Sequence, residues 1–168
     1  MFEVGDYIIY GNSGVCKVTD VGPIDIGGEK SGRLYYTMIP CFSQDGKIFT
    51  PVDNDKILMR SVIDKENAIK LIDDIKNIED LWIADEKKRE YDYKEAIKTC
   101  EPREMIKIIK TIYKRKQSRI AAGKKITASD EKYFKLAENS LYGELAITFE
   151  MTKDEAKEFV VKRVEGIE

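Results

Sequence analysis

The chain has 168 residues and a net charge of −2, and its 42% hydrophobic and 36% charged side chains are typical of a folded globular protein. It has no histidine, which removes the commonest general base, triad member and zinc ligand, and no CxxC pair that could build a thiolate metal site. No apolar run reaches the roughly 18 to 20 residues that span a bilayer, and the N-terminus lacks the layout of a signal peptide. We therefore expect a cytoplasmic protein without membrane association, in which the three widely spaced cysteines are reduced.

The sequence gives little support for an enzyme. Gly123-Lys124-Lys125 resembles part of a phosphate-binding loop, but Ser118 stands where the first glycine of GxxxxGK would be, and a second lysine replaces Ser or Thr. The 31 acidic residues leave a carboxylate-based or lysine-based enzyme as an alternative, but no pair among them is singled out. We expect no catalytic residues, no cofactor, no metal and no small-molecule substrate.

The first sixty residues have the pattern of short strands separated by turns. The turn signals are residues 11–14, the polar stretch 25–32 with Gly27-Gly28, and Asp45-Gly46, which is a strong hairpin signal. The predicted strands are residues 7–10, 15–21, 34–39, 47–52 and 57–59. Five short strands joined by tight turns predict a small, strongly bent antiparallel sheet or barrel.

From Asp64 onward the apolar residues follow a helical period. Asp64 can cap a first helix, a second stretch runs from about Trp82 to Lys98, and Pro102 suits the first turn of a third helix. The buried stripe of the first helix is expected to be Ala68, Leu71, Ile72 and Ile75.

The third helix has two contrasting faces. Met105, Ile109 and Ile112 share one face, and the opposite face carries lysines that we expect to be exposed and aligned. These lysines are Lys107, Lys110 and Lys114.

The remaining elements are also helical. Gly123 closes the third helix or lies just after it, and Thr127 or Ser129 begins a fourth. The last helix starts at a capping box formed by Thr152 and Glu155 and ends near Val164. The buried stripe of the fourth helix is expected to be Phe134, Ala137, Leu141 and Leu145. The sequence thus predicts an α+β protein with a β domain at residues 1–62 and an all-α domain of about five helices at residues 63–168.

Positive charge is concentrated in one segment. Residues 105–135 hold ten of the 29 basic residues against only Asp130 and Glu131, a local net charge of +8 in a chain of net charge −2. Such segregation predicts a surface that meets an anionic partner, with nucleic acid as the first candidate and a membrane or an acidic protein face as rivals.

Trp82 is the only tryptophan. Because Leu81 and Ile83 flank it, the local pattern favours burial in the core. The alternative is an exposed aromatic plane that stacks on or wedges between bases while nearby cations hold phosphates. The cations near it in sequence are Lys87, Lys88, Arg89 and Lys94.

Several segments together resemble the CarD/CdnL family of bacterial transcription regulators. In the N-terminal half these are residues 2–10, Gly14-Val15 and Thr50-Pro51-Val52. In the C-terminal half they resemble the clostridial and bacillar branch, and they are residues 93–96, 109–113, 130–134 and Leu141-Tyr142-Gly143-Glu144-Leu145-Ala146.

The resemblance implies an N-terminal Tudor-like barrel that docks on the β subunit of RNA polymerase, by pairing of an exposed strand edge. It also implies that the helices place a tryptophan at the upstream edge of the melted promoter, where it wedges into the minor groove and slows closure of the bubble. Basic residues around the tryptophan hold phosphates without reading sequence. We therefore expect DNA binding, stabilisation of the open complex and an effect at promoters such as those of ribosomal RNA.

Carried onto this chain, the wedge is Trp82. The phosphate contacts are Lys87, Lys88, Arg89, Lys94, Lys110, Lys114 and Lys125, with Lys107, Arg115 and Arg119 as lesser candidates. The polymerase contacts are Ile48, Phe49, Thr50 and Pro51, which could equally be ordinary strand residues. The alternative function is a protein-interaction adaptor with no DNA role and a buried, structural Trp82.

Overall fold

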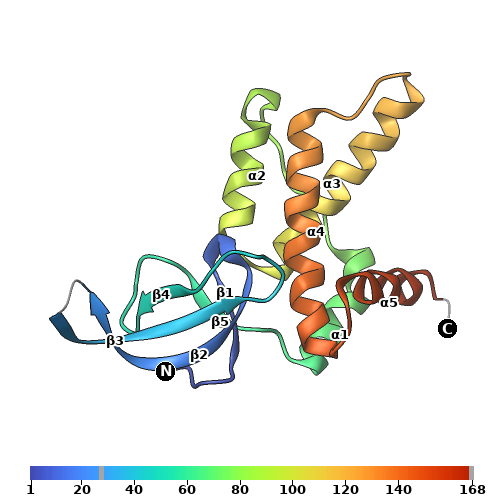
Figure 1. Ribbon diagram of the computed structural model, residues 1–168. Coiled ribbons are helices and arrows are strands. Elements are labelled where there is room, and N and C mark those ends of the chain that lie inside the picture. Colours follow the sequence, from blue (N-terminus) through green and yellow to red (C-terminus); the bar gives the residue numbers. More distant parts are fainter. Residues whose placement is uncertain (27–28, 167–168) are drawn as a thin grey trace. The chain divides into compact units, whose positions relative to one another are not determined.

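The computed structural model describes residues 1–26 and 29–166 (Figure 1). The chain divides into two compact units, Met1–Val62 and Ile63–Glu168. The expected Gly27-Gly28 turn lies outside the described residues. The predicted α+β class is confirmed, because a single antiparallel sheet is followed in the chain by five α-helices.

The first unit is built from five strands in the order β4-β3-β2-β1-β5. They are β1 (Tyr7–Tyr10), β2 (Val15–Ile26), β3 (Glu29–Pro40), β4 (Ile48–Pro51) and β5 (Met59–Ser61), with a 3-10 turn η1 (Gly11–Ser13). The predicted barrel needs correction, because the sheet is open. Both β4 and β5 are short edge strands, and no pairing joins them within residues 1–26 and 29–62.

The sheet is bent by irregular pairing of its two long strands. The register of β2 against β3 shifts between Val18 and Asp20 and again between Pro23 and Asp25, and such bulges increase local twist. Both strands are longer than predicted, since pairing continues through much of the polar stretch that we expected to be a turn. The Asp45-Gly46 signal does lie in the connection of a hairpin, between β3 and β4.

Alternate residues of the central strands form the core of this unit. The buried side chains that pack together are Ile8, Tyr10, Cys16, Val18, Tyr36 and Met38. Their two-residue period places them on one face of the sheet, and Ile9 and Val15, at intervening positions, are buried as well. Burial raises the pKa of the Cys16 thiol to about 11, as expected for a structural thiol rather than a reactive one.

Within residues 63–166, the second unit contains five α-helices and two 3-10 turns. They are α1 (Lys65–Asp73), η2 (Ile75–Asn77), η3 (Glu86–Lys88), α2 (Arg89–Lys98), α3 (Pro102–Ala121), α4 (Ala128–Phe149) and α5 (Lys153–Glu165). None of the described helices is long and apolar enough to cross a membrane.

The predicted helix ends are confirmed at their caps. The side chains of Asp64 and Thr127 accept hydrogen bonds from backbone N–H groups of the first turns of α1 and α4. Thr152 and Glu155 form the complete capping box of α5, and Pro102 occupies the first turn of α3. Gly123 follows α3 with a φ of +74°, a left-handed conformation that glycine adopts without steric cost.

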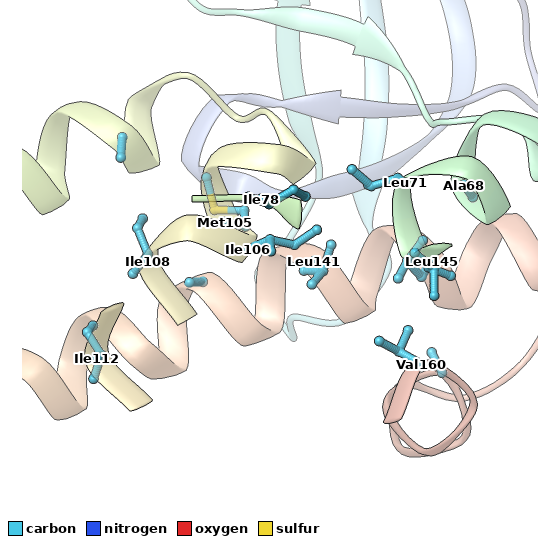
Figure 2. Packing of buried hydrophobic residues seen from close by; sticks show 14 of the residues in the cluster. Ala68, Leu71, Ile78, Met105, Ile106, Ile108, Ile112, Leu141, Leu145 and Val160 are labelled. Carbon is cyan, nitrogen blue, oxygen red and sulfur yellow. The ribbon is translucent and has the colours of Figure 1, made fainter. Parts of the chain in front are cut away.

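The helices share one apolar core (Figure 2). Its buried members include Leu71 of α1, Met105 and Ile112 of α3, Leu141 of α4 and Val160 of α5. Three expected core positions, Ile75, Ile109 and Phe134, are only partly buried. On α3, Ile106 and Ile108 are buried instead of Ile109. The core stripe of α3 is therefore rotated from the predicted one.

A buried glutamate fixes the first residue of this unit. The backbone N–H of Ile63 donates to Glu144 Oε2 at 2.8 Å, and Thr148 Oγ1 donates to the Ile63 carbonyl at 2.7 Å. Both partners lie on α4 and are buried. Glu144 thus satisfies a backbone group where the chain enters the helical unit.

One predicted helix begins later than expected. The second helix was predicted to start near Trp82, but α2 starts at Arg89, and residues 78–85 have no helix. Asp85 accepts a hydrogen bond from the Lys87 N–H and so caps η3. Trp82 therefore lies on a non-helical segment.

Candidate functional site

Trp82 is the most exposed large aromatic residue of the described chain, with 83% of its surface accessible. The expectation of burial from the local pattern is wrong. A single exposed tryptophan is uncommon in a folded unit, because burying its ring would stabilise the fold. Its position therefore needs an explanation other than folding.

The side chains that flank Trp82 in the sequence point toward the core. Leu81 and Ile83 are partly buried and pack against the helical core. Alternate side chains of an extended segment point to opposite sides, so packing of these two residues directs Trp82 outward. The apolar flanks that suggested burial are what present the ring to solvent.

The segment is also held by polar contacts with α3. The Leu81 N–H donates to Thr111 Oγ1 at 2.8 Å. Lys110 Nζ donates to the carbonyls of Ile75 and Ile78, and Lys114 Nζ lies 3.0 Å from Asp80. These contacts fix the backbone immediately before Trp82.

Lys87 and Lys88 are the exposed cations nearest to Trp82 in sequence. Both lie in η3 and form no ion pair within the described part of the chain. Lys94 lies on α2, 4.0 Å from Glu90, and its side chain is also exposed. These three lysines are available to an anionic partner.

The Arg89 side chain forms its contacts within the protein. Its side chain is only 17% exposed, donating to Glu86 at 2.8 Å and to the Tyr93 hydroxyl at 3.0 Å. The hydrogen bonds that Arg89 donates to Glu86 raise the pKa of the Arg89 guanidinium, and the same contact lowers the pKa of Glu86. Arg89 therefore holds η3 against α2.

The expected row of exposed lysines on α3 needs correction. Lys107 and Lys110 are half-buried, and Lys107 pairs with Glu104 at 2.9 Å. Lys110 and Lys114 are bound to the Trp82 segment, as described above. The expected exposure is therefore wrong for Lys107 and Lys110, whereas the side chain of Lys114 is 65% exposed, as expected, although it pairs with Asp80.

Further exposed lysines without an ion pair in the described part of the chain lie toward the end of α3 and beyond it. Lys125 is exposed, and its carbonyl accepts a hydrogen bond from Arg119 Nε at 2.8 Å. In the described ranges, the exposed lysines of this end without a salt bridge are Lys116, Lys124, Lys125 and Lys132.

A buried network joins η3, α2, α3 and α4 beside this site. Asp130 is 1% exposed, lies 3.0 Å from Arg115 Nε and accepts a hydrogen bond from the Tyr93 hydroxyl at 3.0 Å. Arg115 also reaches Glu86 at 3.3 Å. Burial is the main cause of the raised pKa of Tyr93, which keeps the hydroxyl protonated as a donor. Through Arg115 of α3, the network connects Glu86 of η3 with Asp130 in the first turn of α4.

The second candidate surface is the edge strand β4 of the first unit. Phe49 is 50% exposed, and its neighbour Thr50 is buried opposite Tyr36 of β3. Ile48 and Pro51 are half-buried. An edge strand presents unpaired backbone groups, so β4 can accept a further strand, with Phe49 as its exposed side chain.

The sequence did not indicate that Thr111 and Asp80 hold the segment that leads to Trp82. Thr111 is one polar residue on a polar helix face, and its partner Leu81 lies thirty positions away in the sequence. No local pattern signals such a contact. The contact becomes visible only in the structure, where residues 78–83 pack against α3.

These features define an α+β protein with two candidate binding surfaces, a sheet edge and an exposed tryptophan beside cations. Residues 2–63 match the family model of the CarD-like/TRCF RID domain, so the N-terminal unit belongs to this domain family. The resemblance to CarD-like proteins is confirmed there, and at the family level it supports an interaction with RNA polymerase. No curated protein matches the chain.

Proposed function

We propose that the protein is a transcription regulator, not an enzyme, that stabilises the open promoter complex of RNA polymerase. The N-terminal unit binds the polymerase β subunit, and Trp82 wedges into the minor groove at the upstream edge of the bubble. The observation that carries the proposal is the 83% exposure of Trp82 on a segment held by α3. The domain family of residues 2–63 supports RNA polymerase as the partner.

The wedge acts through a difference in affinity between two states. A factor shifts closed toward open promoter only if it binds the open state better. An aromatic side chain fits at a junction where bases have unstacked, and stacking on a base contributes about 1–3 kcal/mol. About 1.4 kcal/mol already changes the equilibrium tenfold.

The lysines near Trp82 provide attraction without sequence specificity. Lys87, Lys88 and Lys94 follow Trp82 closely in the sequence and are exposed, and Lys125 is exposed between α3 and α4. Ammonium groups contact phosphates as point charges and read no bases. The promoter response therefore depends on how unstable each bubble is, which is why promoters of ribosomal RNA are the first to test.

Docking on polymerase brings the wedge to its site. We assign the contact with the β subunit to β4, whose backbone edge and Phe49 are exposed. Pairing of strands gives backbone hydrogen bonds, and Phe49 adds apolar contact.

The test is the lifetime of open complexes on a ribosomal RNA promoter, with the native protein and with Trp82→Ala. We expect the native chain to lengthen the lifetime and the variant to lose most of this effect, about tenfold, because it lacks the stacking surface. Trp82→Phe should retain part of it. The matched control is Tyr113→Ala, which removes another exposed aromatic ring from the same unit and should leave the lifetime unchanged.

If neither protein changes the open-complex lifetime while polymerase binding is retained, the proposed insertion of Trp82 into the promoter DNA is wrong. The protein would then be an adaptor that docks on polymerase. Loss of the effect with Tyr113→Ala as strongly as with Trp82→Ala would also contradict a specific role for the wedge.

A further inference from the structure

Three side chains of α3 contact the segment that leads to Trp82: Lys110 and Thr111 bind its backbone, and Lys114 binds the side chain of Asp80. Lys114 follows Lys110 by four residues and Thr111 by three, spacings that place it beside both on the helix surface. Between them they bind four residues of the segment, which are Ile75, Ile78, Asp80 and Leu81. No other described helix donates a side-chain hydrogen bond to these four residues.

Thr111 is oriented for this contact by its own helix. Its hydroxyl donates to the Lys107 carbonyl at 2.7 Å, one turn back, which leaves its lone pairs toward the segment. The Leu81 N–H donates to that oxygen at 2.8 Å. Residues 78–83 have no regular secondary structure, so the Leu81 N–H has no acceptor in a helix or sheet. The Thr111 hydroxyl oxygen serves as its acceptor.

Lys110 makes an even tighter connection. Its ammonium group donates to the carbonyl of Ile75, the first residue of η2, at 2.8 Å and to that of Ile78, the residue that follows η2, at 2.5 Å. Ile78 itself is buried in the helical core. The side chain is half-buried, so this charge is used within the protein and is not presented to a phosphate.

We propose that Thr111 and Lys110 are positioning residues that hold the Trp82 segment in the conformation in which the indole inserts. This proposal rests on the proposed function and deepens it, since it moves Lys110 from the phosphate contacts to the support of the wedge. A free segment would have to become ordered on insertion, and ordering reduces the free energy gained from stacking. The preformed segment avoids that loss.

Two pairs of variants of the full chain separate positioning from simple stability. Thr111→Val has nearly the same shape as threonine but cannot accept the Leu81 N–H, whereas Thr111→Ser keeps the hydroxyl. Lys110→Met keeps the aliphatic stem without the ammonium group. Lys116→Met is the matched control, because Lys116 lies on the same helix, is exposed and has no ion pair within the described residues.

The first readout uses the free protein. We expect the Leu81 amide proton to exchange roughly tenfold faster in Thr111→Val, the effect of losing one hydrogen bond, and the fluorescence anisotropy of Trp82 to fall. Thr111→Ser should restore both values. Lys110→Met should lower the anisotropy, and Lys116→Met should not. Because Trp82 is the only tryptophan, its signal reports this segment alone.

The second readout is the open-complex lifetime with polymerase. We expect Thr111→Val and Lys110→Met to shorten it severalfold and Thr111→Ser to restore it. Unchanged Leu81 exchange and Trp82 anisotropy in both variants would overturn the proposal. The proposal would also be overturned if Thr111→Val and Lys110→Met loosened the segment but left the open-complex lifetime native, while Trp82→Ala still shortened that lifetime. If Trp82→Ala has no effect on lifetime, the proposed function fails, and the positioning of an inserting indole fails with it, whatever the free-protein readouts show.

Discussion

At the scale of single residues, Asp130 connects more of the helical unit than any position near Trp82. It is buried at the start of α4 and is shared by Arg115 of α3 and Tyr93 of α2. A buried carboxylate is tolerated only when charge and hydrogen bonds compensate it. Its partners extend to η3 through Glu86, so Asp130 helps to hold Lys87 and Lys88 in place.

We expect Asp130→Asn to destabilise the protein by about 2–3 kcal/mol, because it removes the charge facing Arg115 while keeping similar volume. Urea unfolding followed by circular dichroism measures this directly. The control is Glu131→Gln, the neighbouring residue, whose pair with Lys135 is exposed and 3.4 Å long. That change should cost less than about 1 kcal/mol. Equal losses in the two variants would show that Asp130 has no special role.

Single residues are also where prediction from sequence was weakest. The burial of Trp82 was predicted from its apolar neighbours Leu81 and Ile83, but in a non-helical segment the inward packing of these two side chains directs the residue between them outward. Likewise, the alignment of Lys107, Lys110 and Lys114 on one helix face was predictable from periodicity. Their partners were not, because Asp80 and the carbonyl of Ile75 come from another part of the chain.

At the scale of elements, the predicted helix ends were more accurate than the predicted interiors. Asp64, Thr127 and the Thr152 capping box act within one turn of the helix, so the sequence contains both donor and acceptor. The start of α2 was misplaced because residues 78–83 bind to α3 instead of forming their own helical hydrogen bonds. A tertiary contact outweighs local helix preference there.

The edge strand β4 allows a prediction about partner binding. Phe49 is half-exposed and lies opposite Thr37, whereas its neighbours in the strand are more buried. We expect Phe49→Glu to weaken binding to the polymerase β subunit by tenfold or more, because it replaces apolar contact with a charge that must be desolvated. Binding can be measured by titrating the labelled protein with polymerase core enzyme.

The control for this prediction is Val4→Glu, which places the same charge at another exposed apolar residue of the same unit. It should bind polymerase like the native chain. Weaker binding with Val4→Glu and native binding with Phe49→Glu would place the contact elsewhere on the unit. Circular dichroism of both variants checks that the sheet is intact.

At the scale of the whole molecule, the division into a sheet unit and a helical unit follows from the change of apolar period near residue 63. Closure of the sheet did not follow from that pattern. Whether the first and last strands of a small sheet pair depends on strand length and bend, and here β4 and β5 are too short and each has one neighbour. The barrel was the fold that the resemblance to the family implied. The observed strand order, in which β4 and β5 are the two edges, corrects that expectation.

The charge distribution of the whole chain predicts how it meets DNA without polymerase. The net charge is −2, so long-range attraction to duplex DNA is weak even though residues 105–135 carry +8. Several of those charges are used in contacts within the protein, including Lys107, Lys110 and Arg115. Polymerase docking therefore has to supply the local concentration that free binding does not.

We expect weak, sequence-independent and salt-sensitive binding to free duplex. With about three to five phosphate contacts, the logarithm of the affinity should fall against the logarithm of salt with a slope of about −3 to −4. Lys87→Gln combined with Lys88→Gln should reduce this slope by about 2, because two phosphate contacts are lost. Lys162→Gln on α5, which removes a lysine paired with Glu158, should leave the slope unchanged. Tight binding that distinguishes between two duplexes of equal length would contradict this account, because exposed lysines attract phosphates and read no bases.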